Sequence, residues 1–228
     1  LAQGPEPVIE TLRASDGVQI IITYYGPPAR KGTAQAKQAT SVVMLHDYKD
    51  TRVAFAPLAR RLQSQGDAEG KGPSFAVVMV DLRGHGDSTK QYSASGDQRE
   101  LDVTKIGKSD IADMATLDLE VVRKFLVGKN DAGELNLNKL CLMATGMGEN
   151  VAVNWAARDW AAPPLAIGKQ GQDVKALVLV SPRWSYQGLG FQGPLAFRPL
   201  NQNVAWMLIY GAQDSKVKTD VDRIYKQL

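Results

Sequence analysis

Five short, nearly uninterrupted runs of apolar residues constrain the fold of this chain more than any other feature of its sequence. Runs of this kind are typical of strands that are buried on both faces of a parallel sheet. Most of the segments between them carry apolar residues at helical spacing. Buried strands that alternate with helices predict an α/β fold with a mostly parallel, doubly wound sheet. The five runs lie at 41–45, 75–80, 139–144, 174–180 and 204–210.

A short antiparallel β-hairpin is predicted ahead of the parallel strands, because two strand-like runs flank the turn former Asp16-Gly17. The segments 89–108 and 186–203 show no periodicity and are predicted to be irregular, so we expect no helical lid domain. The whole chain, residues 1–228, then forms a single domain. Helices are predicted from Asp50 or Thr51 to Gly66, from Ser109 to Gly128, from about Gly148 to Trp160, and from Thr219 to Leu228.

Composition argues against several classes of function. The net charge of +3 is small and scattered, which disfavours a nucleic-acid-binding protein. The single cysteine, Cys141, excludes an internal disulfide. With only two histidines, His46 and His85, the composition also argues against a histidine-built metal centre. No metal or cofactor is therefore expected. No apolar run approaches the roughly 20 residues that span a bilayer. The first residues, L-A-Q-G-P-E-P, favour an exported or periplasmic protein after removal of a signal peptide, with a trimmed recombinant chain as the alternative.

Polar or turn-forming residues follow each predicted parallel strand directly. In open α/β sheets ligands bind outside the carboxyl ends of the strands, so residues at these positions share one candidate cleft. The residues that follow the five strands are His46, Asp81, Gly146, Ser181 and Asp214.

The third of these positions has the pattern of a nucleophile elbow. Residues 144–148 read A-T-G-M-G, between a predicted strand and a predicted helix. In the motif G-x-S-x-G a sharp strand-to-helix turn lifts a serine above the sheet. Here glycine, Gly146, stands where the nucleophile belongs.

Four segments together resemble the α/β-hydrolase superfamily, in its subgroup of small serine esterases and peptidases. They are V-V-M-L-H-D at 42–47, D-L-R-G-H-G-D-S at 81–88, the elbow at 144–148, and M-L-I-Y-G-A-Q-D at 207–214. The resemblance extends from the first hairpin to the last helix. It implies a nucleophile at position 146, an acid at Asp214, a histidine beyond Asp214, and an oxyanion loop at His46. The last strand and helix of the family are missing from this sequence.

Two members of the implied triad are absent, because Gly146 has no side chain and no histidine follows His85. Loss of the serine or the histidine of such a triad lowers turnover by about 10⁶. We therefore predict a protein that is inactive as a serine hydrolase and that binds a small molecule or a protein partner. The alternative is an active esterase- or peptidase-like hydrolase, either with water activated by Glu149 or His46, or with a triad completed outside this sequence.

Several neighbours of the elbow are candidates for the oxyanion site or the cleft. The amides of Met147 and Gly148 are predicted to point out of a helix N-terminus, where a small anion or carbonyl binds. Asp47 would repel an oxyanion, and Glu149 is either a general base or an acidic residue in the first helical turn. The exposed edge of the last strand predicts a homodimer. The full candidate set is His46, Asp47, Tyr48, Met147, Gly148, Glu149 and Ser181.

Overall fold

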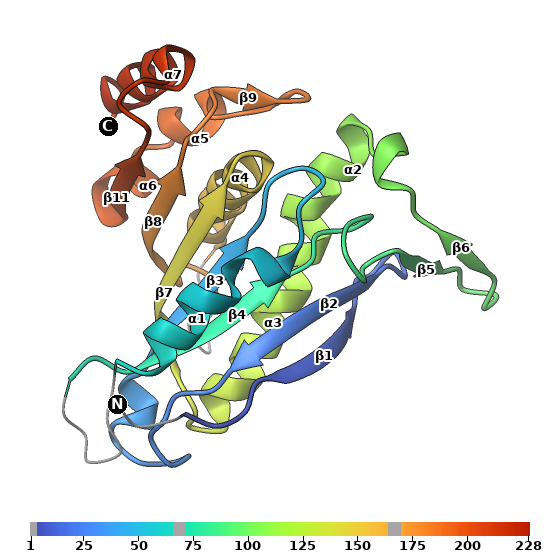
Figure 1. Cartoon of the computed structure of the whole chain (residues 1–228), viewed down its shortest axis with the longest axis vertical. Coiled ribbons are helices and arrows are strands. Elements are labelled where there is room, and N and C mark those ends of the chain that lie inside the picture. Colours follow the sequence, from blue (N-terminus) through green and yellow to red (C-terminus); the bar gives the residue numbers. More distant parts are fainter. Residues whose placement is uncertain (1–3, 66–71, 164–169) are drawn as a thin grey trace.

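The computed structural model describes residues 4–65, 72–163 and 170–228 of the chain. Its centre is a seven-stranded sheet in which the first hairpin is antiparallel and the five later strands are parallel to one another (Figure 1). The mostly parallel sheet and the N-terminal hairpin predicted from the sequence are confirmed. In spatial order the strands are β1 (Val8–Arg13), β2 (Gln19–Tyr25), β4 (Phe75–Val80), β3 (Thr40–Leu45), β7 (Asn136–Thr145), β8 (Val174–Val180) and β11 (Ala205–Ile209).

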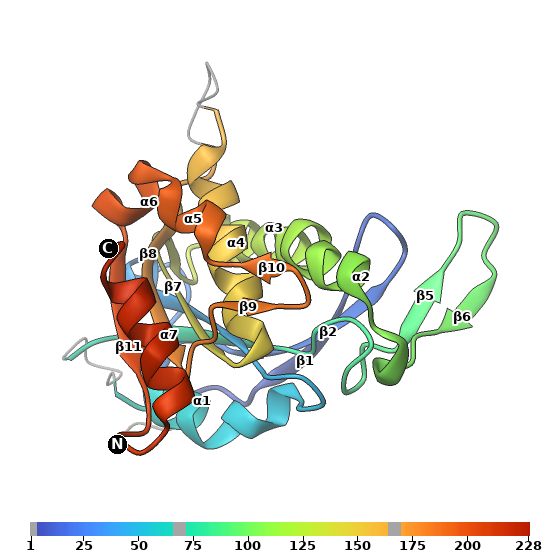
Figure 2. The same cartoon turned by 90° about the horizontal axis from the view of Figure 1, so that it is seen from above.

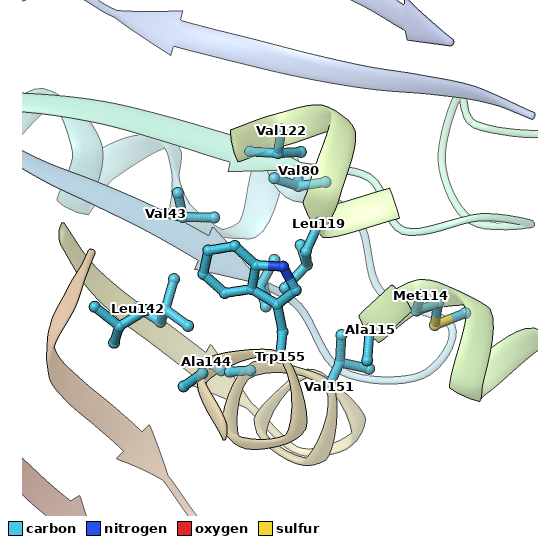
Figure 3. Packing of buried hydrophobic residues seen from close by; sticks show 14 of the residues in the cluster. Val43, Val80, Met114, Ala115, Leu119, Val122, Leu142, Ala144, Val151 and Trp155 are labelled. Carbon is cyan, nitrogen blue, oxygen red and sulfur yellow. The ribbon is translucent and has the colours of Figure 1, made fainter. Parts of the chain in front are cut away.

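Helices cover both faces of the sheet. Figure 2 shows α3 (Leu119–Asp131) and α4 (Met147–Ala161) on one side and α1 (Ala56–Gln63) on the other. The larger core lies between the sheet and α3 and α4, where Trp155 fills the space between Leu142 of the sheet and Leu119 of the helix layer (Figure 3). The smaller core lies beneath α1.

Two predicted helix boundaries were wrong for local reasons. The helix from Lys108 passes through Gly128 and ends near Gly133, whose φ of +70° is the left-handed conformation that stops a helix. Gly128 lies on the exposed side, where glycine costs only about 1 kcal/mol in a helix. This helix consists of α2 (Lys108–Asp113), a π-helical turn η4 (Met114–Asp118), and α3.

The last helix, α7 (Ser215–Tyr225), begins four residues before the predicted cap Thr219. Its N-cap is Asp214, whose carboxylate accepts a hydrogen bond of 3.0 Å from the amide of Val217. The first helix begins as a 3₁₀ turn, η2 (Arg52–Phe55), and continues as α1. Its predicted stop, Gly66, lies outside the described residues.

The two segments predicted to be irregular contain elements too short to give a periodic signal. Residues 89–108 contain the hairpin β5 (Lys90–Tyr92) and β6 (Gln98–Glu100), followed by η3 (Val103–Lys105). The stretch between β8 and β11 contains four short elements and no separate lid. These are β9 (Ser185–Tyr186), β10 (Leu189–Gly190), α5 (Gln192–Ala196) and α6 (Arg198–Asn203). Elsewhere in the chain, a short 3₁₀ turn, η1 (Ala36–Gln38), precedes β3.

Within the described residues, β11 is an edge strand that pairs only with β8. No described helix is long and apolar enough to cross a membrane.

Candidate functional site

The loop after β4 is held by a buried ion pair rather than arranged for chemistry. Asp81 accepts a hydrogen bond from the backbone amide of Arg52 at 2.7 Å and from the amide of Asp87 at 2.9 Å, and its carboxylate pairs with the Arg52 guanidinium. A Cβ at Gly86 would lie 2.2 Å from an Asp81 carboxylate oxygen, which explains the glycine there. The segment 81–88 therefore ties the end of β4 to the start of η2.

Arg83 of the same loop forms a second buried network. Its guanidinium contacts the carboxylates of Asp118, Asp16 and Asp113 at 2.6, 2.8 and 3.3 Å. Asp118 is fully buried, and burial raises its pKa to about 6 in spite of the adjacent guanidinium. The loop is thus fixed to the first hairpin and to the π-helical turn.

The elbow itself keeps its sharp geometry. Gly146 lies between β7 and α4 with φ of +52° and ψ of −120°, a conformation that glycine adopts without the strain other residues incur. A Cβ at Gly148 would lie 2.7 Å from the carbonyl oxygens of Leu45 and His46, so the second glycine lets α4 approach β3 closely.

The space above Gly146 is filled by the side chain of Asp47. One carboxylate oxygen, Oδ1, accepts hydrogen bonds from the amide of Met147 and from the amide of Tyr48, each at 2.7 Å. The first of these amides belongs to the N-terminus of a 15-residue helix, where a negative charge is favoured. The anion site expected at Met147 is therefore occupied by a carboxylate of the chain itself.

Asp47 and a side chain at position 146 exclude each other. A Cβ built on Gly146 would lie 2.0 Å from both Cγ and Oδ1 of Asp47. Carbon atoms that are not bonded to each other do not approach so closely, so a serine at this position requires Asp47 to leave. Glycine is the residue that this arrangement of Asp47 demands.

His46 is committed to the backbone on both sides of its ring. Its Nε2 accepts a hydrogen bond from the amide of Leu82 at 3.1 Å, and its Nδ1 donates to the carbonyl of Asp47 at 2.7 Å. The side chain is completely buried, and this burial lowers its pKa. Because Nε2 accepts a hydrogen bond, the imidazole is neutral. His46 links the ends of β3 and β4.

Glu149 lies in the first turn of α4 and is also completely buried. Burial and the negative charge of Asp47 raise the pKa of Glu149 to about 9, with Arg183 opposing the shift in part. By hydrogen-bond geometry neither of its carboxyl oxygens has a partner among the described residues, although the backbone at Val180 and Arg183 lies near enough to oppose the rise in pKa. At neutral pH the side chain is therefore a protonated, uncharged acid beside the Asp47 carboxylate.

The remaining candidate residues lie around this centre. Tyr48 donates its hydroxyl to the carbonyl of Val103 at 3.2 Å, and its ring lies near the rings of His85 and Tyr186, at 5.8 and 6.1 Å between centroids. Ser181 follows β8 directly and has a φ of +66°, and its amide donates to the carbonyl of Ile209 at 2.7 Å.

No protein-family model matches this chain, and no curated protein matches it in sequence. Solved structures do match. A dienelactone hydrolase from Anabaena variabilis is 19% identical with a TM-score of 0.60, over 98% of this chain and 82% of that one. Thermogutta terrifontis esterase 2 is 12% identical with a TM-score of 0.58, over 98% and 78% of the two chains. The chain has the α/β-hydrolase fold.

Because the sequence identity to each of these hydrolases is low, the likeness is one of fold. DcsB, at a TM-score of 0.53 and 19% identity, matches over 79% of this chain, which spans about half (47%) of the DcsB chain. In the α/β-hydrolase fold, Gly146 stands at the tip of the elbow, at the end of β7, and Asp214 stands two strands away at the end of β11.

Sequence reasoning placed Asp47 beside the expected oxyanion position but missed that its carboxylate accepts hydrogen bonds from the amides of Met147 and Tyr48. The signal was present, since Asp47 and Gly146 are both unusual for the motifs that they occupy. Their interaction joins residues 100 positions apart, and only the register of β3 on β7 brings them together.

Proposed function

We propose that this protein is a non-catalytic member of the α/β-hydrolase fold that binds a ligand or a partner instead of hydrolysing a substrate. The observation that carries the proposal is the double hydrogen bond of Asp47 to the amides of Met147 and Tyr48. Those two amides are the donors that an oxyanion would need. An anionic group already bound to them adds repulsion where a reaction would develop negative charge.

Within the described residues, the titratable groups beside the elbow do not replace the nucleophile that Gly146 lacks. His46 uses both ring nitrogens for backbone hydrogen bonds and is completely buried. Glu149 is uncharged at neutral pH and has no exposed surface, so it cannot take a proton from a water molecule in solution. Both facts support binding without turnover.

An open groove lies beside the elbow amides that Asp47 occupies, and this groove supports a small-molecule ligand. It has a volume of about 780 Å³ and lies at the carboxyl ends of β3 and β4, where ligands bind in open α/β sheets. Its walls include Lys49, Asp50, His85, Glu100 and Asp102. In the second form of this proposal, the protein binds a protein partner instead of a small molecule.

The alternative is an active hydrolase that uses Glu149, and one observation favours it. A strongly raised carboxyl pKa at the ends of the strands is a frequent property of catalytic acids and bases. Burial of the entire side chain argues against this role, since the group reaches substrate only if α4 or its neighbours move.

A panel of p-nitrophenyl esters separates the two hypotheses. The proposal predicts that the purified protein releases nitrophenol no faster than buffer, and that Glu149→Gln and His46→Ala change nothing. Turnover that copurifies with the protein and falls in Glu149→Gln would refute the proposal. The variant Lys31→Ala, at a side chain that is 62% exposed and lies outside this groove, serves as the control for effects of mutation alone.

A further inference from the structure

The groove beside the elbow carries charges of both signs on its walls. Its lining includes the carboxylates of Asp50, Glu100 and Asp102 and the ammonium groups of Lys49 and Lys105. Asp102 and Lys105 form an ion pair with each other, at 3.6 Å between Oδ2 and Nζ. An anionic ligand would meet three carboxylates in this space, and a cationic ligand would meet two lysines. The groove therefore suits a ligand that carries no net charge of its own.

The other three charged side chains are available to a ligand. Among the described residues, Glu100 forms no hydrogen bond or ion pair. Asp50 accepts one backbone amide, at 2.8 Å through Oδ1, and its second oxygen is free of the chain. Lys49 has no carboxylate partner among the described residues, and its Nζ lies 5.4 Å from the centre of the Tyr48 ring. The lining thus offers both acceptors and a donor.

A further acceptor belongs to the ring of His85, which lines the groove and is 2% exposed. Its Nδ1 lies 2.9 Å from the carbonyl of Arg83, and a carbonyl only accepts, so Nδ1 carries a proton. Burial lowers the pKa of His85 from its ordinary value of 6.5, so the ring is neutral at neutral pH and Nε2 has a free lone pair. No described group donates to Nε2. A ligand hydroxyl that reached Nε2 would supply the donor that this buried acceptor lacks.

The walls of the groove are fixed by contacts within the chain. The loop 81–88 is held by the two buried ion-pair networks described above. The amide of Leu101 donates to the carbonyl of Thr89 at 2.6 Å, and the hydroxyl of Tyr48 donates to the carbonyl of Val103 at 3.2 Å. Binding to groups that are already in place loses less conformational entropy than binding to mobile ones.

We propose that this groove binds a neutral, hydroxyl-rich ligand, namely a saccharide. A hydroxyl both donates and accepts hydrogen bonds, so one such ligand donates to Asp50 and Glu100 and accepts from Lys49. The half-buried side chains of Leu101 and Val103 also line the groove and offer apolar contact to the C–H groups of a sugar ring. The inference rests on the small-molecule form of the proposed function and names the class of the ligand.

Two charged classes of ligand compete with a saccharide for this groove. A polyamine would be attracted by the carboxylates but repelled by Lys49, and a phosphate compound would be attracted by the lysines but repelled by three carboxylates. Salt distinguishes the classes, because charge interactions are screened beyond about 3 Å in 1 M salt. Hydrogen bonds to an uncharged saccharide do not depend on salt in this way.

A nuclear magnetic resonance titration of the full chain tests the proposal, since the chain has only two histidines. The protein, labelled with ¹⁵N at histidine, is titrated with glucose, galactose, mannose, xylose, cellobiose, maltose and lactose. We expect at least one saccharide to shift the ring resonances of His85 in a saturable way, also in about 1 M salt. His46 is the internal control, because both of its ring nitrogens already bond to the backbone.

Two exposed carboxylates of the groove provide the variants. Asp50→Ala and Glu100→Ala should each raise the dissociation constant of the saccharide about tenfold, because each removes a charged hydrogen-bond acceptor. Glu6→Ala is the matched control, since Glu6 is an exposed carboxylate outside the groove, and it should leave the dissociation constant unchanged. An unchanged His46 resonance shows that each variant is folded.

The proposal is overturned if no saccharide of the panel shifts His85, or if Asp50→Ala and Glu100→Ala both leave the titration unchanged. Tighter binding of spermidine or of pyrophosphate than of every saccharide would overturn it as well. Ester hydrolysis is a separate outcome, because it would refute the non-catalytic role without changing the saccharide titration. Failure of the titration in turn leaves the result of the ester panel intact.

Discussion

Asp47 and Gly146 form a pair in which each residue makes the other necessary. The carboxylate needs the empty space above a glycine, and the two amides that would otherwise bind an external anion receive their acceptor from Asp47. The absence of a nucleophile is thus one half of a local structure. The sequence alone suggested an open anion site at the Met147 amide, whereas the pair shows that Asp47 occupies this amide.

A double-mutant cycle measures this pairing. Gly146→Ser alone should lower the free energy of unfolding by about 1–3 kcal/mol, because its Cβ overlaps the Asp47 carboxylate. Asp47→Gly should relieve that cost, so that the double variant is more stable than the sum of the single effects predicts. Urea denaturation of the four proteins gives the coupling energy. Additive effects would show that Asp47 does not occupy this space in solution.

Glu149 predicts a pH dependence of stability. Its pKa rises from 4.5 in the unfolded chain to about 9 in the folded one, so the folded state holds the proton more tightly. The stabilisation that comes from this group is complete below about pH 4.5 and is lost as the pH rises towards about 9. Stability should therefore fall across this range on account of Glu149.

The variant Glu149→Gln isolates this contribution, because glutamine keeps the shape of the protonated acid and does not titrate. The difference in unfolding free energy between Glu149→Gln and the parent chain should grow with pH from about 4.5 to about 9. Chemical denaturation at several pH values gives this difference. A difference that stays constant with pH would show that Glu149 is not a buried neutral acid.

At the scale of elements, strands were easier to predict than helix ends. The strands at 75–80 and 174–180 appear with the predicted bounds, because purely apolar runs of this length have one favourable environment. Helix ends depend on single residues with several possible roles. Gly128 is the helix stop expected from the sequence, but it lies within α3, and the helix ends near Gly133 instead.

The cap of α7 gives a direct test at this scale. Asp214→Ala should cost about 1 kcal/mol of stability, because the amide of Val217 loses its acceptor. Thr219→Ala, the residue expected from the sequence to cap the helix, should change stability by less than half as much, since Thr219 lies inside the helix and is exposed. Thermal unfolding of the two variants compares them. A larger effect at Thr219 would contradict the observed start of α7.

At the scale of the whole molecule, the mostly parallel sheet and the common carboxyl edge of its strands were predictable, and the contents of the candidate site were only partly so. Alternating burial patterns determine which residues face a helix layer. They do not reveal that Arg52 is buried against Asp81, because a charged residue in the first turn of a helix is normally exposed. Nor do they reveal that α1 packs over β3 and β4.

The overlap between Asp47 and any side chain at position 146 also affects the order of mutations by which this chain could gain a hydrolase-like site or could have lost one. A serine gained at position 146 while Asp47 is in place meets a carboxylate at 2.0 Å. If Asp47 is replaced first, the local effect is only that the amides of Met147 and Tyr48 lose their acceptor. A mutational path that changes position 47 before position 146 avoids this overlap, whereas the reverse order carries its cost in the intermediate.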